Sequence, residues 1–371
     1  MISILIVFCC ILSYNNEAES RKFLIRNLRF PHEALLLKDA DENTFNRRLA
    51  GSFSGAVATV WEYGKEDITI SAGMAEITDS IRFMTRDTYF DLASLTKQLC
   101  TAPLILMLAD KGRLSLNDNL KNHFKEFVDT PYAQTTIYEL LAHKSKIISH
   151  YRFFRYNIER EKLIEFLSRE KPLKKSIYSD LNYIILGMLL EKIEGEKLDK
   201  LFDEKIAKPL NLSITFNPDE KMDIASSQYC RWRRRQLRTT EVHDENAWFW
   251  NNINGHAGLF GNASDIANLM SAYMGYSRNL FFSPFTLNRL LSYSGNKTDI
   301  ALGFKSNKNS MAAKNLGKYA IGHTGYTGSS IWMEHSRGLV VVLLTNSLHP
   351  SYHRNINNIR KEFHDMILRK E

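Results

Sequence analysis

Apolar and polar residues follow strand-like patterns near both ends of the chain. Residues 55–75 (GAVATVWEYGKEDITISAGMA) contain two β-rich runs around the polar segment 63–67, which predicts an antiparallel hairpin. Residues 329–333 and 339–346 predict two further strands. The second of these (LVVVLLTN) is apolar on both faces, so we expect it to be a central strand.

The middle of the chain predicts helices, because apolar residues recur there every three or four positions. These segments are 95–108, 137–142, 158–167 and 181–193, and amphipathic helices are also predicted at 354–368 and at about 40–50. We therefore predict an α/β fold of the α+β type. An antiparallel sheet formed from both chain ends (about 40–90 and 300–371) is flanked by helices, with a mostly helical region inserted at about 100–290. A ligand would lie in a cleft between the two parts.

Residues 1–12 (MISILIVFCCIL) are almost entirely apolar and are followed by a polar stretch, which is typical of a secretory signal peptide. The run is too short to span a bilayer as a stable helix. We expect a signal peptide at 1–19, one functional domain at 20–371, and an exported protein in the periplasm or outside the cell, where peripheral association with the envelope is feasible. A lipid-anchored Cys9 or Cys10 and a cytoplasmic location are less favoured alternatives.

The composition is that of an ordinary globular protein, with 44% hydrophobic and 24% charged residues. No nucleic-acid-binding motif accompanies the net charge of +8, so we expect no nucleic-acid partner. Beyond the apolar N-terminus only Cys100 and Cys230 remain, which excludes a zinc site built from thiolates. The densest basic cluster, which we interpret as a solvated face, consists of Arg231, Arg233, Arg234, Arg235 and Arg238.

The strongest local feature is the segment 90–97 (FDLASLTK), in which Ser94 opens an apolar helix and Lys97 follows three residues later. These positions share one helix face, so the amine can reach the hydroxyl and take its proton. The alternative is a capping serine with a solvated lysine below it. The same spacing recurs at 168–171 and 294–297, but in a charged stretch and in a turn-like segment, respectively.

A second feature is the segment 178–183 (YSDLNY), at the entry to another apolar helix. The phenol of Tyr178, if it lies beside an ammonium group, could carry protons between nucleophile and leaving group. Asp180 could orient that ammonium group or the substrate. The alternative is a tyrosine packed at a helix start beside an aspartate that caps it.

A third feature is the segment 322–328 (GHTGYTG), whose glycines permit close backbone approach to a ligand. The backbone N–H of Tyr326 could join that of Ser94 in holding an oxyanion. A bend at the start of an edge strand would also explain these glycines.

Taken in order, Ser-x-x-Lys, Tyr-x-Asn/Asp and Lys/His-Thr-Gly resemble the triple signature of the β-lactamase-related serine hydrolases, which include penicillin-binding proteins and class C β-lactamases. Residues 242–247 (VHDENA), 255–261 (GHAGLFG) and 341–350 (VVLLTNSLHP) resemble the branch with serine esterases and muramyl-peptide amidases, and the resemblance spans about 52–360. It implies a β-lactamase/transpeptidase-like fold and an acyl-enzyme mechanism without cofactor or metal. The implied catalytic residues are Ser94, Lys97 and Tyr178, and the implied substrate-binding residues are Asp180, His323, Thr324, Gly325 and Tyr326.

Three departures from the family pattern matter. His323 stands where many members have lysine, so a permanent cation for a substrate carboxylate is missing and efficient β-lactam hydrolysis is not expected. Asp180 stands in place of asparagine, which should keep Lys97 protonated and give Tyr178 more of the proton transfer. Lys146 occupies a helix end that usually closes with glycine, where a positive φ is expected.

We therefore expect a serine hydrolase that cleaves a carboxylic ester or amide bond in a small molecule or a cell-wall peptide. The alternatives are β-lactamase or D-alanyl-D-alanine carboxypeptidase activity, or a binding module without turnover. The segment 243–246 (HDEN) with His256 could suggest a metal site or a glycosidase carboxylate pair, but its spacing fits neither. We interpret it as a loop whose polar groups satisfy one another, and the neighbouring aromatics at 248–250 as core or as a substrate wall.

Overall fold

The computed structural model describes residues 53–368, apart from 79, 231–232, 234, 238, 278–280, 294–299, 308–311, 318 and 351–355. The signal peptide predicted at 1–19, the helix predicted at about 40–50 and the turn predicted at 294–297 lie outside the described residues.

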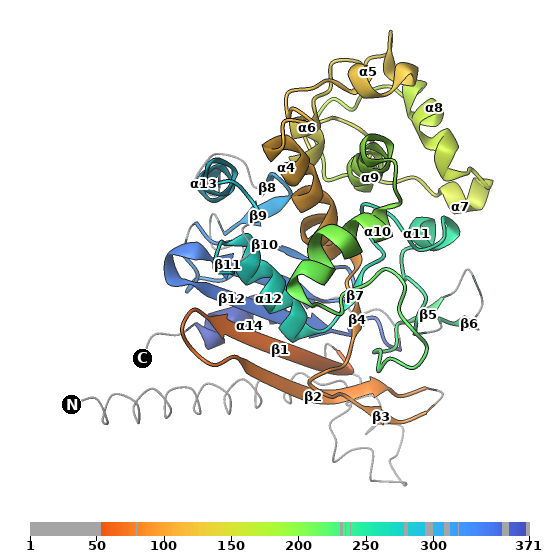
Figure 1. Ribbon diagram of the computed structural model, residues 1–371. Helices are drawn as coiled ribbons and strands as arrows, with labels where there is room; N and C mark the ends of the chain where they lie inside the picture. The colour runs from red at the N-terminus through yellow and green to blue at the C-terminus, as the bar shows by residue number, and fades with distance from the viewer. Residues whose placement is uncertain are drawn as a thin grey trace.

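One antiparallel sheet occupies the centre of the described structure, in the order β3-β2-β1-β12-β11-β10-β9-β8 (Figure 1). Both halves of the chain contribute to it, and this confirms the predicted α+β fold. The strands are β1 (Gly55–Glu62), β2 (Ile68–Glu76), β3 (Arg82–Phe83), β8 (Ile300–Ala301), β9 (Phe304–Ser306), β10 (Ile321–Thr324), β11 (Ser330–Glu334) and β12 (Leu339–Thr345). Two short pairs lie outside this sheet: β4 (Phe90–Asp91) with β7 (Phe260–Gly261), and β5 (Tyr229–Cys230) with β6 (Arg235–Gln236).

The central strand β12 is buried along its whole length between β1 and β11, as its apolar sequence predicts. Successive side chains of a strand point to opposite faces of the sheet. Val340, Val342 and Leu344 accordingly join one hydrophobic core, while Leu339, Val341 and Leu343 join a second. The second core is closed by α14 (Ile356–Ile367), and α12 (Ala263–Tyr273) packs against the other face of β1 and β12. Both faces are therefore covered, which is why no polar position interrupts the strand.

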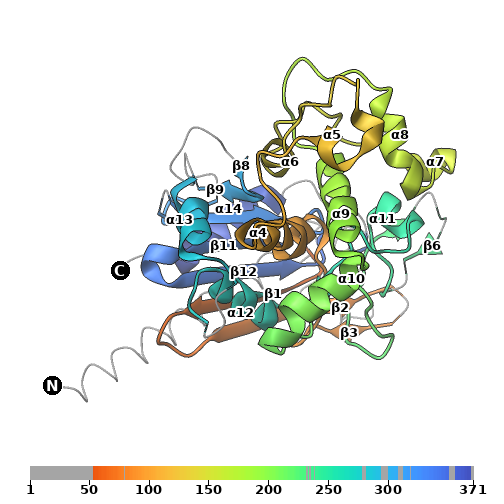
Figure 2. The same ribbon diagram turned by 45° about the horizontal axis from the view of Figure 1, so that its top comes forward.

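The residues between the two groups of strands fold mainly into helices, and Figure 2 shows them gathered on one side of the sheet. The predicted helical segments at 95–108, 137–142, 158–167, 181–193 and 354–368 all contain helices. None of the helices in the described ranges combines the length and apolarity needed to cross a membrane. The remaining helices are α4 (Ala102–Asp110), α5 (Leu120–His123), α6 (Ile137–Leu141), α7 (Phe153–Tyr156), α8 (Leu163–Ser168), α9 (Asp180–Glu194), α10 (Leu198–Phe202), α11 (Glu245–Phe249) and α13 (Pro284–Tyr293).

Of the arginine cluster the structure describes Arg233 and Arg235, while Arg231, Arg234 and Arg238 lie outside the described residues. The two described members do not share one solvated face, which corrects that interpretation for them. The Arg233 guanidinium is buried and lies 3.9 Å above the ring of Trp248, whereas Arg235 is exposed and pairs with Glu241. A guanidinium stacked on an aromatic face is stabilised by the negative face of the ring. Trp250 packs in the core and donates a hydrogen bond to the carbonyl of Ile158, so this aromatic is core.

Candidate active site

The segment that contains Ser94 follows β4 directly as a tight turn. Residues 93–95 form a 3-10 turn and residues 97–101 a π-helical turn, after which α4 continues. Ala93 has a φ of 46°, which is uncommon for a residue with a Cβ. The buried carboxylate of Asp91 holds this conformation by accepting a hydrogen bond from the N–H of Ala93 at 2.8 Å. Burial raises the pKa of Asp91 to about 6. The strained turn leaves Ser94 partly exposed, a placement typical of functional residues.

Lys97 is fully buried directly beneath Ser94. Its Nζ donates hydrogen bonds to Ser94 Oγ at 2.8 Å and to the carbonyl of His256 at 3.0 Å, and it pairs with Asp180 Oδ1 at 2.8 Å. Burial by itself lowers the pKa of this lysine, but Asp180 and Tyr178 outweigh burial and raise it above its ordinary value. Lys97 is therefore a cation at neutral pH, as the sequence predicts from the aspartate at position 180.

Tyr178 lies just before α9 and completes this cluster. Lys97 Nζ lies 5.2 Å from the centre of its ring, and the His143 ring stacks on it at 4.2 Å. Burial raises the pKa of the phenol. The charge of Lys97 and hydrogen bonds with Ser94 and Lys97 lower this pKa, but burial outweighs them and the pKa of Tyr178 is raised. Asp180 is the first residue of α9, and Ser179 occupies the N-cap position.

The third segment places its two polar side chains differently from the prediction. His323 is buried rather than at a substrate-lining edge, and its ring lies 5.9 Å from that of Tyr178. Its Nδ1 lies 2.9 Å from the carbonyl of Thr324, so this nitrogen carries the proton. Burial, Lys305 and Lys97 lower the pKa of His323 well below its ordinary value, so it is neutral. Only Thr324 of this pair is partly exposed.

The turn after β10 packs against the segment that contains Ser94. Gly325 N–H donates to the carbonyl of Ser329 at 2.7 Å, and Thr327 Oγ1 donates to the carbonyl of Asp91 at 2.8 Å. A Cβ on Gly325 would lie 2.8 Å from the carbonyl oxygen of Leu92, closer than such contacts tolerate. This glycine therefore allows the turn to approach the backbone of Leu92, whereas the sequence had suggested that it allows a ligand to approach.

Arg360 of α14 supports the same turn from below. Its Nε donates to the carbonyl of Gly328 at 2.8 Å, and its Nη2 donates to that of Gly325. The side chain of Tyr326 is exposed, with its ring 5.3 Å from that of His243. The backbone of the turn is thus held beside Ser94 while the Tyr326 ring faces outward.

The structure adds a charged residue that the sequence analysis missed. Lys305 of β9 lies opposite Gly322 of β10, and its Nζ lies 3.1 Å from Thr324 Oγ1 and 5.7 Å from the centre of the Tyr178 ring. No local motif marks this lysine. Only the pairing of β9 with β10 could have identified it.

The other sequence candidates have structural roles. Asp244 accepts a hydrogen bond from the N–H of Ala247 at the start of α11 and pairs with His256 Nε2 at 3.0 Å. This pair fits the predicted loop of mutually satisfied polar groups, whereas His243 contacts Gln228 and Asn246 donates to the carbonyl of Tyr151. Among the described residues, no group of three or more His, Cys, Asp or Glu could hold a metal ion. Ser168 ends α8 and donates to the carbonyl of Glu165.

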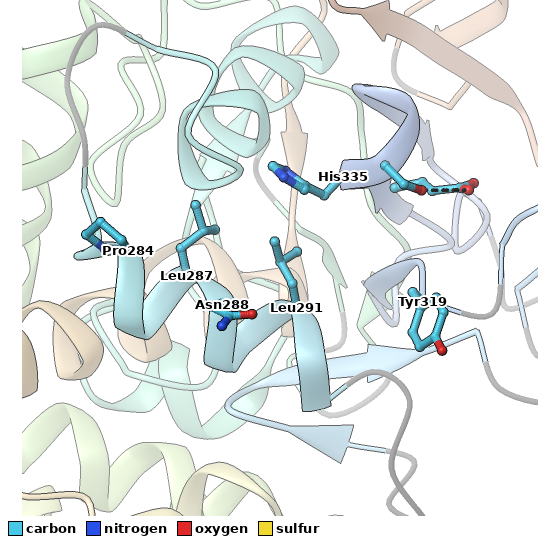
Figure 3. Close-up of a pocket in the computed structure, with 8 residues that line it drawn as sticks. Pro284, Leu287, Asn288, Leu291, Tyr319 and His335 are labelled. Carbon is cyan, nitrogen blue, oxygen red and sulfur yellow. Dashed lines mark hydrogen bonds between the residues drawn. The ribbon is translucent and has the colours of Figure 1, made fainter.

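A cavity of about 490 Å³ lies away from this cluster, at the far end of β11 (Figure 3). It contains none of the residues gathered around Ser94, so it does not belong to the candidate active site. Its lining is formed by Pro284, Leu287, Asn288, Leu291, Tyr319, Glu334, His335 and Ser336.

Comparison with known proteins gives consistent results. The family model described as Beta-lactamase matches residues 41–363. The chain is 29% identical to an N-acetylmuramyl-L-alanine amidase of Bacillus subtilis (90% of this chain, 84% of that protein). It is 30% identical to an Escherichia coli K12 protein that carries the provisional name D-alanyl-D-alanine carboxypeptidase (71% of this chain, 70% of that protein). The solved structure of EstCE1, titled a hydrolase with promiscuous acyltransferase activity, aligns with a TM-score of 0.71 at 16% identity, covering 98% of this chain and 100% of that one.

Proposed function

Because the chain belongs to the β-lactamase family of serine hydrolases, we propose that it cleaves a carboxylic ester or amide bond through an acyl-enzyme formed on Ser94. The observation that carries this proposal is the contact of 2.8 Å between Ser94 Oγ and Lys97 Nζ, made beside the phenol of Tyr178. Nucleophilic catalysis by serine needs such a partner to manage the hydroxyl proton. A binding module without turnover would have no need to keep a buried lysine against a partly exposed serine.

Tyr178 is the proton acceptor in this mechanism, since Asp180 keeps Lys97 protonated. The phenolate form takes the proton as Ser94 Oγ bonds to the substrate carbonyl carbon, whose π electrons move to the oxygen. When the tetrahedral intermediate collapses, the bond to the leaving group breaks and the leaving group takes that proton. The Lys97 cation favours the phenolate throughout.

Deacylation repeats these steps with water as the nucleophile. Water gives a proton to the Tyr178 phenolate, its oxygen bonds to the acyl carbon, and Ser94 Oγ departs with the proton. The backbone N–H groups of Ser94 and Tyr326 hold the oxyanion in both halves of the reaction. The anchoring of the 325–328 turn against the nucleophile segment supports this assignment.

Among substrates, we rank an ester or amide, in a small molecule or a cell-wall peptide, above a β-lactam. The names of the amidase and carboxypeptidase relatives support this ranking, as does the neutral, buried His323 in the position of the usual lysine. Carboxypeptidase or β-lactamase activity is the second candidate within the same chemistry.

Three measurements test the proposal. We expect turnover of p-nitrophenyl acetate, with negligible turnover of nitrocefin; the reverse order would overturn the substrate ranking. A fluorophosphonate probe should label the wild type and Ser168→Ala, which alters a serine in the same Ser-x-x-Lys spacing, but not Ser94→Ala. Equal labelling of Ser94→Ala would reject the nucleophile. Esterase activity should survive a strong chelator, because no step uses a metal.

A further inference from the structure

Lys305 is a charged residue of the active site that the proposed mechanism leaves unused. It is half-buried on β9, and its Nζ contacts Thr324 Oγ1 at 3.1 Å. It also lies 5.7 Å from the centre of the Tyr178 ring, whose other ammonium neighbour is Lys97 at 5.2 Å. Two ammonium groups therefore flank the same phenol, one beneath the nucleophile and one beside Thr324.

The Lys305 ammonium group has no anionic partner within the part of the chain that the structure describes. Its Nζ donates to the neutral hydroxyl of Thr324, and no carboxylate oxygen of a described residue lies within 4.0 Å. A partly buried cation is costly unless it is paired. The acidic side chain nearest the cluster, Asp180, is already paired with Lys97.

The charged groups around Lys305 add positive charge and no negative charge. Burial, then Arg360, then Lys97 lower the pKa of Lys305 to about 8. Burial and Lys97 lower the pKa of His143 to about 3, and His323 is likewise neutral, so both rings are uncharged. The titratable and charged groups that face Lys305 are thus Lys97, Arg360, Tyr178, His143 and His323, and none of them is an anion in the resting site.

We propose that Lys305 binds a carboxylate of the substrate beside Thr324, and so replaces from the neighbouring strand the cation that His323 does not provide. This rests on the proposed function and narrows it to esters or amides with a carboxylate close to the scissile bond. Lys97 and Lys305 both contact the ring of Tyr178, so a carboxylate bound to Lys305 lies close to Ser94. Since one residue of extended chain spans about 3.3–3.6 Å, that carboxylate lies within one or two residues of the carbonyl that Ser94 attacks.

The test uses two thioester substrates that differ only in charge: benzoylglycyl thioglycolate and the corresponding thioglycolamide, with thiol release as the signal. Wild type should prefer the anionic substrate. Lys305→Met should lower kcat/KM for that substrate about 10- to 100-fold, mostly through KM, the range expected for a hydrogen bond to a charged group. The neutral substrate should change less than about threefold, and Lys305→Arg should retain the preference.

The pH dependence separates charge from packing. The anionic preference of the wild type should decline above about pH 8, as Lys305 loses its proton, and should persist in Lys305→Arg, whose guanidinium stays charged. Labelling by a neutral fluorophosphonate should be equally fast in wild type and Lys305→Met, which establishes that the variant folds. If it does not label, Lys305→Gln takes its place.

Equal losses on both substrates in Lys305→Met, or no anionic preference in the wild type, would overturn this inference and leave the proposed function standing. A wild type that hydrolyses neither substrate and does not label at Ser94 would overturn both.

Discussion

Replacing Asp180 by asparagine tests whether its carboxylate sets the pKa of the proton acceptor beside Ser94. Asp180 raises the pKa of both groups, since it stabilises the Lys97 cation and repels a Tyr178 phenolate. The Asp180→Asn substitution would remove the charge but keep an oxygen that can accept from Lys97. Whichever group gives up its proton, the basic form then exists at lower pH. The alkaline rise of kcat/KM on a neutral ester should therefore move to lower pH.

The size of this effect follows from the contact of 2.8 Å between Asp180 Oδ1 and Lys97 Nζ. Coulomb's law gives about 6 kcal/mol for two unit charges at this distance and an effective dielectric constant of about 20. The desolvation of the carboxylate, which asparagine no longer requires, offsets part of this. We expect a net change of about 1.5–4 kcal/mol, or a displacement of the profile by about 1–3 pH units at about 1.4 kcal/mol per unit.

The assay is the pH profile of kcat/KM for p-nitrophenyl acetate from about pH 6 to about pH 10, a range chosen to bracket the expected displacement. The control is Asp203→Asn, which breaks the exposed pair with Lys208 and should leave the profile in place. Stability supplies a second readout. A lysine whose folded pKa is raised contributes stability that is full below its unfolded pKa and is lost as pH rises through the folded value. Asp180→Asn should therefore lower the free energy of unfolding near neutral pH, by up to about 3 kcal/mol. An unmoved profile, or one displaced to higher pH, would refute the reasoning.

Three further substitutions give separate checks. Lys146→Gly should raise the free energy of unfolding by about 0.5–1 kcal/mol in urea denaturation, because φ is 61° at this exposed residue; a loss of stability would contradict this. Gly325→Ala should lower kcat for p-nitrophenyl acetate at least about tenfold, because its Cβ would push the turn away from Leu92; unchanged kcat would show that the turn does not hold the oxyanion. His323→Lys restores the usual family residue, yet it should lower the melting temperature and give no nitrocefin turnover, because the new cation would be buried near Lys305 and Lys97; a gain of nitrocefin turnover would show that the lysine alone was missing.

Much of the fold can be read from local pattern. The hairpin of β1 and β2 follows from the two β-rich runs on either side of residues 63–67, and the central position of β12 from its unbroken apolar run, which is buried throughout. The helix that carries Lys97 and the one that follows Tyr178 have visible periodicity. The positive φ at Lys146 was also expected, from the resemblance to a family segment that closes with glycine, although α6 ends at Leu141 and Lys146 lies in the loop that follows.

The residues of the site also differ in whether local sequence motifs or long-range strand pairing place them there. The order of the motifs predicted a site made of Ser94, Lys97, Tyr178 and Asp180, and the structure brings these residues together. The sequence also predicted that Asp180 would hold Lys97 as a cation. It did not identify Lys305, and it placed His323 at the edge rather than behind Tyr178. The pairing of β9 with β10 brings Lys305 to Thr324. The sequence of a short strand such as β9 does not show which other strand it will pair with.

The sequence by itself thus determined the chemical groups of this protein and the elements that carry them, because backbone periodicity and side-chain spacing are local properties. The Lys97 cation was expected from Asp180, but only the tertiary structure decided the charge of the other groups and which of them can reach a ligand. Charge depends on burial and on neighbours distant in sequence: burial and nearby cations keep His323 neutral and lower the pKa of Lys305.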